Sequence, residues 1–355
     1  MPPSPAPRFL IAAGGTAGHV LPALAIAEAL GRRGASVTLA GRPDSVEQRL
    51  AAQTGLEFDA FRVEGIPREA SLRTVGAVLR AAVAPAACLR ILRRRRPDTV
   101  LGAGGYVGGP MVLAAGTLRI PAALTEADAH LGLANRLAAP FARRVFCAFP
   151  IEGLHGPKYK VVGRPIPDRS RVPDRAAARE AFDLPADGSV VLIFGGSQGS
   201  RRLNEAALEA FAAEGPAVLH LAGERDYPDL EQRARRPEYR LLPYTDEFGA
   251  ALAAADLVVA RAGGSVWEVA AAGKPALLVP YPHATANHQA KNARYFERGG
   301  GAVVVPEPEL DLRRQVGELL ADPARLEEMG NAMRAQAKPD AAEVVAEELL
   351  SLARA

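Results

Sequence analysis

The sequence predicts an α/β protein built from two Rossmann-like, doubly wound domains that face each other across a cleft. Three glycine-rich loops indicate this fold: residues 14–19 (Gly-Gly-Thr-Ala-Gly-His), 102–106 (Gly-Ala-Gly-Gly-Tyr) and 195–199 (Gly-Gly-Ser-Gln-Gly). Each follows a short apolar run typical of a buried strand and precedes a stretch that can form a helix. Such a junction gathers backbone N–H groups and the positive end of a helix dipole, which together bind anionic groups such as phosphates.

The first half of the chain alternates between strand-like and helix-like segments, as in a parallel sheet with crossover helices. Pro22 is expected in the first turn of its helix, where the missing N–H is not needed. The expected strands are residues 9–13, 36–40, 57–61, 99–101, 122–124 and 144–147, and the expected helices are residues 22–30, 46–53, 72–92, 107–118 and 131–137.

Two prolines close to residue 164 interrupt this alternation and predict a domain boundary. We expect an N-terminal domain over residues 1–163 and a C-terminal domain over residues 164–339. A final helix within residues 340–355 has apolar residues at helical spacing and is expected to pack back on the first domain. The second half contains a helix-like piece at residues 175–182 and expected strands at residues 190–194, 217–221, 239–242, 257–260, 276–279 and 302–305.

Composition argues against a nucleic-acid-binding, a disulfide-rich, a secreted or a membrane-spanning protein. The formal net charge of +3 gives no indication of nucleic-acid binding. Only two cysteines are present, both in apolar surroundings, so a reducing cytoplasm is expected rather than a disulfide framework. The proline-rich start lacks the apolar region of a signal peptide, and no apolar run is long enough to span a bilayer.

The charge distribution is more informative than the total. Between residues 71 and 125 the only acid is Asp98, whereas eight arginines occur there. One interpretation is a solvated helix end whose arginines interact favourably with the helix dipole. The other is a basic surface that meets anionic lipid head groups, next to an apolar stripe formed by Leu72, Val75, Val78, Leu79 and Val83.

His19 ends the first glycine loop and is expected at a helix start. The loop removes water from the imidazole and the helix N-terminus disfavours its cation, so the ring should be neutral, as a general base requires. The alternative is a residue that only shapes the loop.

A fourth strand–glycine–helix junction, residues 261–268, places Glu268 one turn into a helix. Its carboxylate can accept two hydrogen bonds from a ribose diol, although a favourable contact with the helix dipole would explain it equally well. The polar cluster at residues 280–292 suits sugar hydroxyls, or else a capped helix start. His283 and His288 lack a third ligand at convincing spacing, so we predict no metal and no cofactor.

The order of these motifs resembles the MurG family of GT-B-fold N-acetylglucosaminyltransferases. The matching motifs are Gly-Gly-Thr-x-Gly-His, Gly-x-Gly-Gly-Tyr-Val, Gly-Gly-Ser-Gln-Gly, Arg-Ala-Gly, Glu-x-Ala-Ala-x-Gly and His-Gln-x-x-Asn. The resemblance implies inverting transfer of GlcNAc from UDP-GlcNAc to lipid I, undecaprenyl-pyrophosphoryl-MurNAc-pentapeptide. Lipid II would form at the cytoplasmic face of the cell membrane. The enzyme would bind peripherally to the anionic surface of that membrane.

The resemblance also implies roles for single residues. His19 is the expected base, with Asp128 as the alternative. Donor sugar and acceptor would lie by Thr16, Ala17 and Gly18, and Tyr106 would border the acceptor. In the second domain, Ser197 and Gln198 would contact the diphosphate, Thr245 would lie by the uracil, Glu268 would hold the ribose, and Gln289 would bind the GlcNAc hydroxyls. Gly264 and Ser265 are further expected substrate-binding residues.

Two departures from the family pattern affect the expected site. Asp128 stands where an asparagine is usual, and Pro167 stands where the family has the arginine of the diphosphate site. Arg164, three residues earlier, is expected to replace that arginine. Two alternatives stay open: a related GT-B transferase acting on another lipid or on a secondary metabolite, and a nucleotide-sugar-binding module without catalysis.

Overall fold

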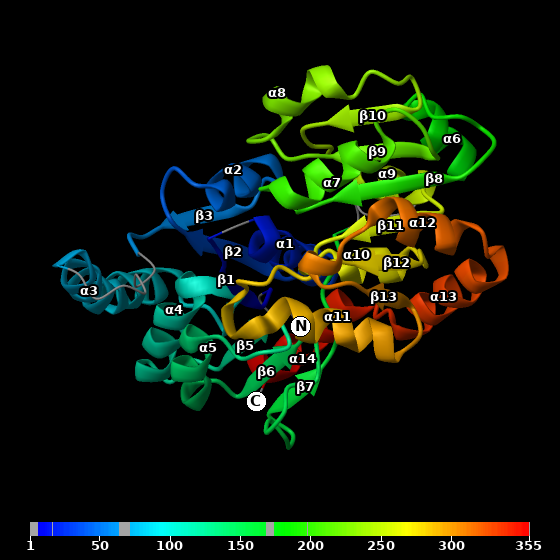
Figure 1. The fold of residues 1–355 in the computed structure, drawn as a ribbon. Coiled ribbons are helices and arrows are strands. Elements are labelled where there is room, and N and C mark those ends of the chain that lie inside the picture. Colours follow the sequence, from blue (N-terminus) through cyan, green and yellow to red (C-terminus); the bar gives the residue numbers. More distant parts are fainter. Residues whose placement is uncertain (1–5, 16, 64–71, 168–173, 197, 355) are drawn as a thin grey trace. The chain divides into compact units, whose positions relative to one another are not determined.

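The computed structural model describes residues 6–15, 17–63, 72–167, 174–196 and 198–354, with backbone alone at residues 17 and 72–83. The chain divides into two compact units (Figure 1). Unit 1 comprises Met1–Pro167 and Pro339–Ala355, and unit 2 comprises Asp168–Lys338. Within the described ranges, no helix combines the length and the apolar character needed to cross a membrane.

Unit 1 is built on a seven-stranded sheet with the order β3-β2-β1-β4-β5-β6-β7, in which every neighbouring pair is parallel. The order reverses between β1 and β4. Its elements are β1 (Arg8–Ala12), α1 (Ala17–Arg32), β2 (Ser36–Gly41), α2 (Val46–Gln53), β3 (Glu57–Ala60), α3 (Leu72–Arg95), β4 (Thr99–Gly102), α4 (Gly105–Thr117), β5 (Ala122–Glu126), α5 (Leu133–Ala138), the 3-10 helix η1 (Ala139–Phe141), β6 (Arg144–Cys147), β7 (Tyr159–Val161) and α14 (Ala341–Arg354).

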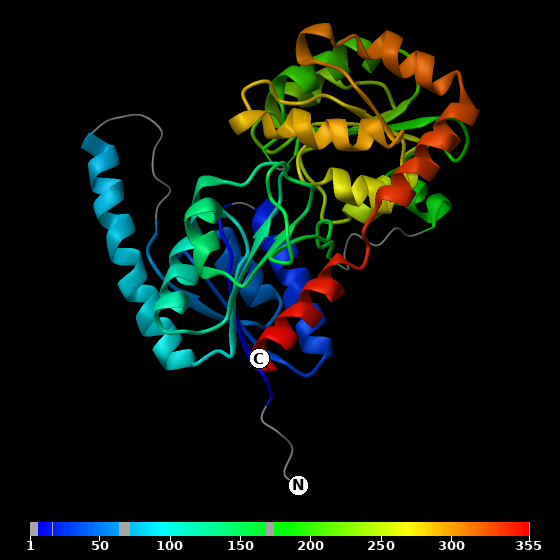
Figure 2. The same cartoon turned by 90° about the horizontal axis from the view of Figure 1, so that it is seen from below.

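Both faces of this sheet are covered, because alternate side chains of a strand point to opposite faces. On β1, Phe9 and Ile11 belong to a core formed with α1 and α14, whereas Leu10 belongs to a second core with α3, α4 and α5. Helix α14 lies alongside α1 (Figure 2), and its Val345 and Leu349 are fully buried there. The last helix of the chain is therefore part of the N-terminal unit.

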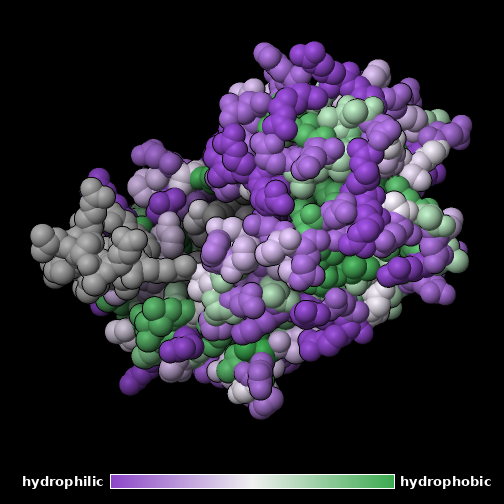
Figure 3. Space-filling view, in the orientation of Figure 1, coloured by the Kyte–Doolittle hydropathy of each residue, from purple (hydrophilic) through white to green (hydrophobic). Residues whose placement is uncertain are grey.

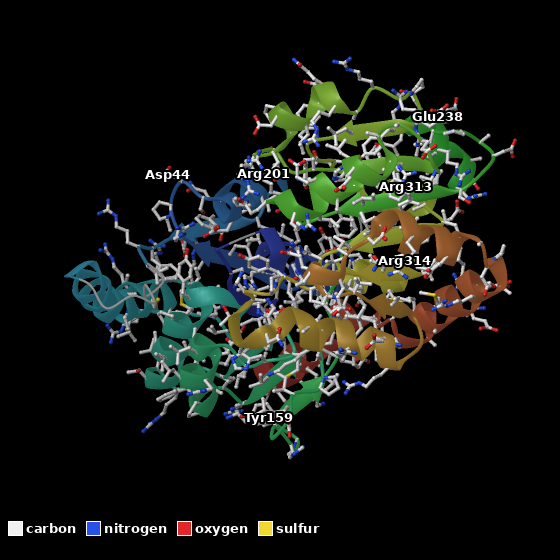
Figure 4. All side chains as sticks on the ribbon, in the orientation of Figure 1. Asp44, Tyr159, Arg201, Glu238, Arg313 and Arg314 are labelled. Atoms are coloured by element: carbon white, nitrogen blue, oxygen red, sulfur yellow. The ribbon has the colours of Figure 1, made fainter. Side chains whose placement is uncertain are left out.

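Two features of unit 1 differ from the sequence-based expectation. Helix α1 begins at Ala17, so Pro22 lies inside the helix and the prediction that it occupies the first turn was wrong. The strand β7 was not predicted; it extends the sheet beside β6 and carries Tyr159 (Figure 4). Three residues are too few for a clear alternating pattern, so pairing with β6 determines this strand.

Unit 2 contains a six-stranded sheet with the order β10-β9-β8-β11-β12-β13, also parallel throughout, and its order reverses between β8 and β11. Val191 and Ile193 of β8 are fully buried in a core with α7 and α12. Its elements are α6 (Arg175–Ala181), β8 (Val190–Phe194), α7 (Arg201–Phe211), β9 (Ala217–Leu221), α8 (Tyr227–Leu230), β10 (Tyr239–Leu242), α9 (Phe248–Ala254), β11 (Leu257–Ala260), α10 (Val266–Ala271), β12 (Ala276–Leu278), α11 (His288–Arg298), β13 (Ala302–Val304), α12 (Leu312–Leu320) and α13 (Pro323–Gln336), with 3-10 helices at Glu231–Arg233, Thr285–Asn287 and Glu307–Glu309.

The prediction of two Rossmann-like, doubly wound domains is confirmed. In open parallel sheets, ligands bind outside the carboxyl ends of the strands, where the strand order reverses. In unit 1 the loops after β1 and β4 lie at that point, and in unit 2 the loops after β8 and β11 do. All four are the glycine-containing loops that the sequence singled out.

Candidate active site

In unit 1, the imidazole of His19 packs against the loop after β4. His19 is the third residue of α1. A Cβ atom on Gly104 would lie 2.6 Å from Nδ1 of His19, and Gly104 has a φ of 82°. Gly105 follows with a φ of 67°, and a Cβ there would lie 2.7 Å from the carbonyl oxygen of Gly14. Both glycines are therefore required by space and by backbone conformation.

His19 is in a state that suits a general base. Burial lowers the pKa of its imidazole, the positive charge of Arg164 lowers it further, and the negative charge of Asp128 opposes both effects. The structure thus brings together His19, Asp128 and Arg164, three residues that lie far apart in the sequence. The neutral imidazole is favoured at physiological pH.

A small pocket adjoins His19, with a volume of about 20 Å³, close to the space one water molecule occupies. Gly18, Thr125, Glu126 and Arg164 are among its lining residues. The pocket lies wholly in unit 1, on residues of α1, the ends of β4, β5 and β6, the segment after β7 and α14.

Glu126 is a site residue that the sequence reasoning missed. It is buried at the end of β5 and accepts hydrogen bonds from the backbone N–H of Asp128 (3.3 Å), the backbone N–H of Gly132 (2.9 Å) and Nδ2 of Asn135 (2.9 Å). Burial raises its pKa, and these hydrogen bonds lower it in part. The carboxylate therefore fixes the loop that carries Asp128. In the sequence, the only indication of this role was an acidic residue at the end of an apolar strand.

A second missed residue, Glu47, lies beneath the first glycine loop. Its side chain is 2% exposed, and Oε1 accepts a hydrogen bond from the backbone N–H of Arg42 at 3.2 Å. A Cβ on Gly14 would lie 2.5 Å from that oxygen. The Arg42 guanidinium lies 5.7 Å from the ring centroid of Tyr106, the residue predicted to border the acceptor. Tyr106 thus belongs to the same edge of the sheet as His19.

In unit 2, the loops after β8, β9 and β11 lie against one another. Gly199 has a φ of 70°, and a Cβ on it would lie 2.1 Å from the carbonyl oxygen of Ala222. Arg261, buried after β11, donates from Nε to Oγ of Ser200 at 3.0 Å and from Nη1 to the carbonyl of Val279 at 3.1 Å. Its guanidinium therefore joins the start of α7 to the ends of two other strands.

The described residues of unit 2 that were predicted to bind the donor follow strands of this sheet at the same edge. Gln198 is exposed after β8, and Thr245 is half-buried after β10, where its hydroxyl accepts a hydrogen bond from the N–H of Glu247 at 3.0 Å. Oε1 of Gln289, after β12, accepts from the N–H of Tyr281 at 2.9 Å, which leaves its NH2 group to be a donor. Gly264, Ser265 and Glu268, all half-buried, follow β11.

Thr16 and Ser197, two predicted contacts, lie outside the described residues, as does the side chain of Ala17. Among the side chains that are described, no cluster of three or more His, Cys, Asp and Glu could hold a metal ion.

A buried polar network supports the loops of unit 2. Asn204 of α7 donates from Nδ2 to the carbonyl of Ala222 at 2.9 Å and to Asp226 at 3.1 Å, so its Oδ1 faces Nε2 of His220 at 3.0 Å. Nε2 must then carry the proton, and Nδ1 accepts from the hydroxyl of Tyr239 at 2.8 Å. Burial lowers the pKa of His220 to about 3.

His220 is expected to make the stability of unit 2 depend on pH. Its pKa is depressed in the folded state, so its contribution is complete above pH 6.5 and is lost as the pH falls toward 3. Urea unfolding of His220→Gln, followed by the fluorescence of Trp267, should show a smaller loss of stability between pH 7.5 and 4.5 than the wild type shows. Replacing the exposed His155 in the same way is the control; an equal loss in both variants would contradict the assignment.

Comparison with known proteins agrees with this geometry. The glycosyltransferase family 28 N-terminal domain matches residues 9–147, and the glycosyltransferase family 28 C-terminal domain matches residues 190–345. The chain is 41% identical to a protein of Acidithiobacillus ferrooxidans, covering 96% of each chain, and 39% identical to one of Salinibacter ruber, covering 98% of this chain and 97% of the other. Both are named UDP-N-acetylglucosamine–N-acetylmuramyl-(pentapeptide) pyrophosphoryl-undecaprenol N-acetylglucosamine transferase.

Among solved structures, that of Acinetobacter baumannii MurG superimposes with a TM-score of 0.78 and 29% sequence identity. The similarity covers 98% of this chain and 100% of that one, so both units and α14 are included. The resemblance expected from the glycine loops is confirmed. The two domain matches, the full-length relatives and the shared fold show that the chain belongs to the MurG family of glycosyltransferase family 28.

Proposed function

We propose that this protein transfers GlcNAc from UDP-GlcNAc to lipid I with inversion at the anomeric carbon, which yields lipid II for peptidoglycan synthesis. The observation that carries this function is the alignment with relatives named as this transferase. It covers 96–98% of the chain and therefore includes both units. Unit 2 would hold the donor and unit 1 the acceptor. The polar residues after β8, β10, β11 and β12 support the donor assignment, because they share one sheet edge.

In the proposed mechanism, His19 removes the proton from the acceptor hydroxyl while that oxygen attacks the anomeric carbon, and UDP leaves. The lowered pKa of His19 supports this role, and Asp128 is the alternative base. Backbone N–H groups of the loop after β8, together with the N-terminus of α7, would meet the charge that develops on the leaving diphosphate. Ser197, Gln198 and Arg164 are further proposed diphosphate contacts, and Thr16, Ala17 and Gly18 would adjoin the transferred sugar.

A donor and acceptor panel tests the assignment. UDP-GlcNAc is compared with other UDP-sugars, and lipid I analogues are compared with free MurNAc. The departures at Asp128 and Arg164 favour one second candidate, a related transferase with a different lipid or secondary-metabolite acceptor. Turnover of UDP-GlcNAc with another acceptor but not with a lipid I analogue would support that candidate. Binding of UDP-GlcNAc without transfer to any acceptor would favour a non-catalytic module.

We further propose peripheral binding to an anionic membrane through unit 1, at the cytoplasmic face. An exposed apolar group supports this: Leu133, Leu137 and Phe141 are 59%, 61% and 51% exposed and recur at helical spacing along α5 and η1. Hydrophobic side chains gather in this region (Figure 3), and Arg136 and Arg143 are exposed in the same segment.

The arginine-rich end of α3 contributes less free charge than its sequence indicates. Arg94 donates to Asp59 at 2.6 Å, and Arg95 donates from Nε to Asp59 at 2.7 Å and forms an ion pair with Glu57. Glu57 and Asp59 come from β3, outside the arginine-rich stretch of residues 71–125. The apolar stripe predicted on α3, from Leu72 to Val83, lies outside the described side chains.

Replacing Leu133, Leu137 and Phe141 together by serine is expected to weaken binding to anionic liposomes at least about tenfold, since burying one such side chain contributes about 1.5–3 kcal/mol. Co-sedimentation measures this effect, and Val161→Ser, at an exposed position of the same unit, is the control. Wild-type binding should weaken as salt screens the arginines. Equal, salt-insensitive binding to neutral and anionic liposomes would contradict the proposed attraction between these arginines and anionic lipids.

A further inference from the structure

The position of Pro22 leaves one backbone carbonyl of α1 without its helical partner. In an α-helix the carbonyl of residue i accepts a hydrogen bond from the N–H of residue i+4. The partner of Gly18 is Pro22, which has no N–H. Gly18 immediately precedes His19, so the missing bond lies in the turn that carries the imidazole.

Arg164 takes the place of that missing donor. Its Nη2 donates a hydrogen bond to the carbonyl oxygen of Gly18, across 146 residues of sequence. Arg164 is only 9% exposed and lies in the segment after β7, within unit 1. The guanidinium is buried, so this contact restricts both the segment after β7 and the first turn of α1.

We propose that Arg164 is a positioning residue, which fixes the first turn of α1 through the Gly18 carbonyl and keeps a positive charge beside the His19 imidazole. This inference rests on the proposed role of His19 as base. It differs from the expectation that Arg164 binds the donor diphosphate, and the two roles predict different measurements.

Three charged groups from other elements face the surroundings of His19. Arg164 comes from the segment after β7, and Asp128 and Glu126 come from the end of β5 and its loop. The charge of Arg164 disfavours the imidazolium, and that of Asp128 favours it. Removing the arginine should therefore raise the pKa of His19, whereas removing the aspartate should lower it.

Histidine titration followed by NMR tests the electrostatic part on the full chain, without substrate. The His19 signal is assigned by its loss in His19→Gln. In Arg164→Gln the titration midpoint should move to higher pH, and in Asp128→Asn it should move to lower pH. Arg164→Lys, which retains a cation, should move the midpoint less than Arg164→Gln does. An unchanged midpoint in Arg164→Gln would overturn the proposal.

A double-mutant cycle with Pro22 tests the positioning part. Pro22→Ala restores an N–H that can bond to Gly18. Arg164→Gln should speed hydrogen exchange at the start of α1 in the wild-type background and should have less effect in the Pro22→Ala background. Arg143→Gln, at an exposed position of unit 1, is the control. Equal effects in both backgrounds would overturn the positioning role.

Kinetics distinguishes the two roles of Arg164. If Arg164 is a positioning residue, Arg164→Gln should lower kcat with little change in KM for UDP-GlcNAc. The fall in kcat should be largest at low pH, because more of His19 would then be protonated. A rise in that KM alone, with an unchanged pH profile, would overturn the proposal in favour of the diphosphate contact. If no donor and acceptor pair reacts, the proposed function fails, whereas the titration and exchange experiments still decide on Arg164.

Discussion

Replacing His19 by alanine is expected to lower kcat by a factor of about 10²–10⁴, with little change in the affinity for UDP. Loss of a general base removes an interaction that forms only during proton transfer, so ground-state binding should persist. The burial of His19 and the charge of Arg164 favour the neutral imidazole, which can accept that proton. Steady-state kinetics with a lipid I analogue, together with calorimetry for UDP, measures both quantities.

The matched control is His155→Ala, because His155 is exposed in the same unit and away from the sheet edge that carries the glycine loops. It should retain the wild-type kcat. A fall of only a few-fold in His19→Ala would reduce His19 to a residue that shapes the glycine loop. Asp128→Asn would then be the next variant to examine, because Asp128 is the alternative base and its charge acts on His19.

Replacing Glu268 by alanine is expected to weaken UDP binding by about 1–3 kcal/mol, which corresponds to about 5- to 150-fold in Kd. In the proposed donor site, its carboxylate accepts hydrogen bonds from the ribose hydroxyls, which would be left without that partner. Its place after β11, at the reversal of strand order in unit 2, supports this role.

Isothermal calorimetry with UDP measures the effect, and Glu318→Ala provides a control on the exposed surface of α12. The labelled side chains Arg313 and Arg314 mark that helix in Figure 4. Unchanged UDP affinity in Glu268→Ala would remove the ribose assignment. Glu268 would then be explained by its favourable position in the first turn of α10 alone.

The sequence by itself determined the parallel architecture of both units. The five-residue apolar run Val190–Phe194, for example, forms β8, because both faces of a parallel sheet are buried. The glycine loops were predictable for a related reason: backbone conformations such as that of Gly104 exclude other residues locally. The order of these loops, together with the motifs Glu-x-Ala-Ala-x-Gly and His-Gln-x-x-Asn, was also sufficient to identify the family.

Tertiary contacts decided what the sequence left open. The prediction for Pro22 failed because a local preference for the first turn cannot anticipate a donor such as Arg164, 146 residues away. The partner of Arg95 was likewise not predictable from its own segment. Its hydrogen bond to Asp59 of β3 forms only in the folded unit. His220 gives no sequence signal, since its partners Tyr239 and Asn204 come from two other elements, β10 and α7. Local propensity fixes most of the elements, whereas a short strand such as β7, the protonation states and the partners of charged groups depend on packing between distant segments.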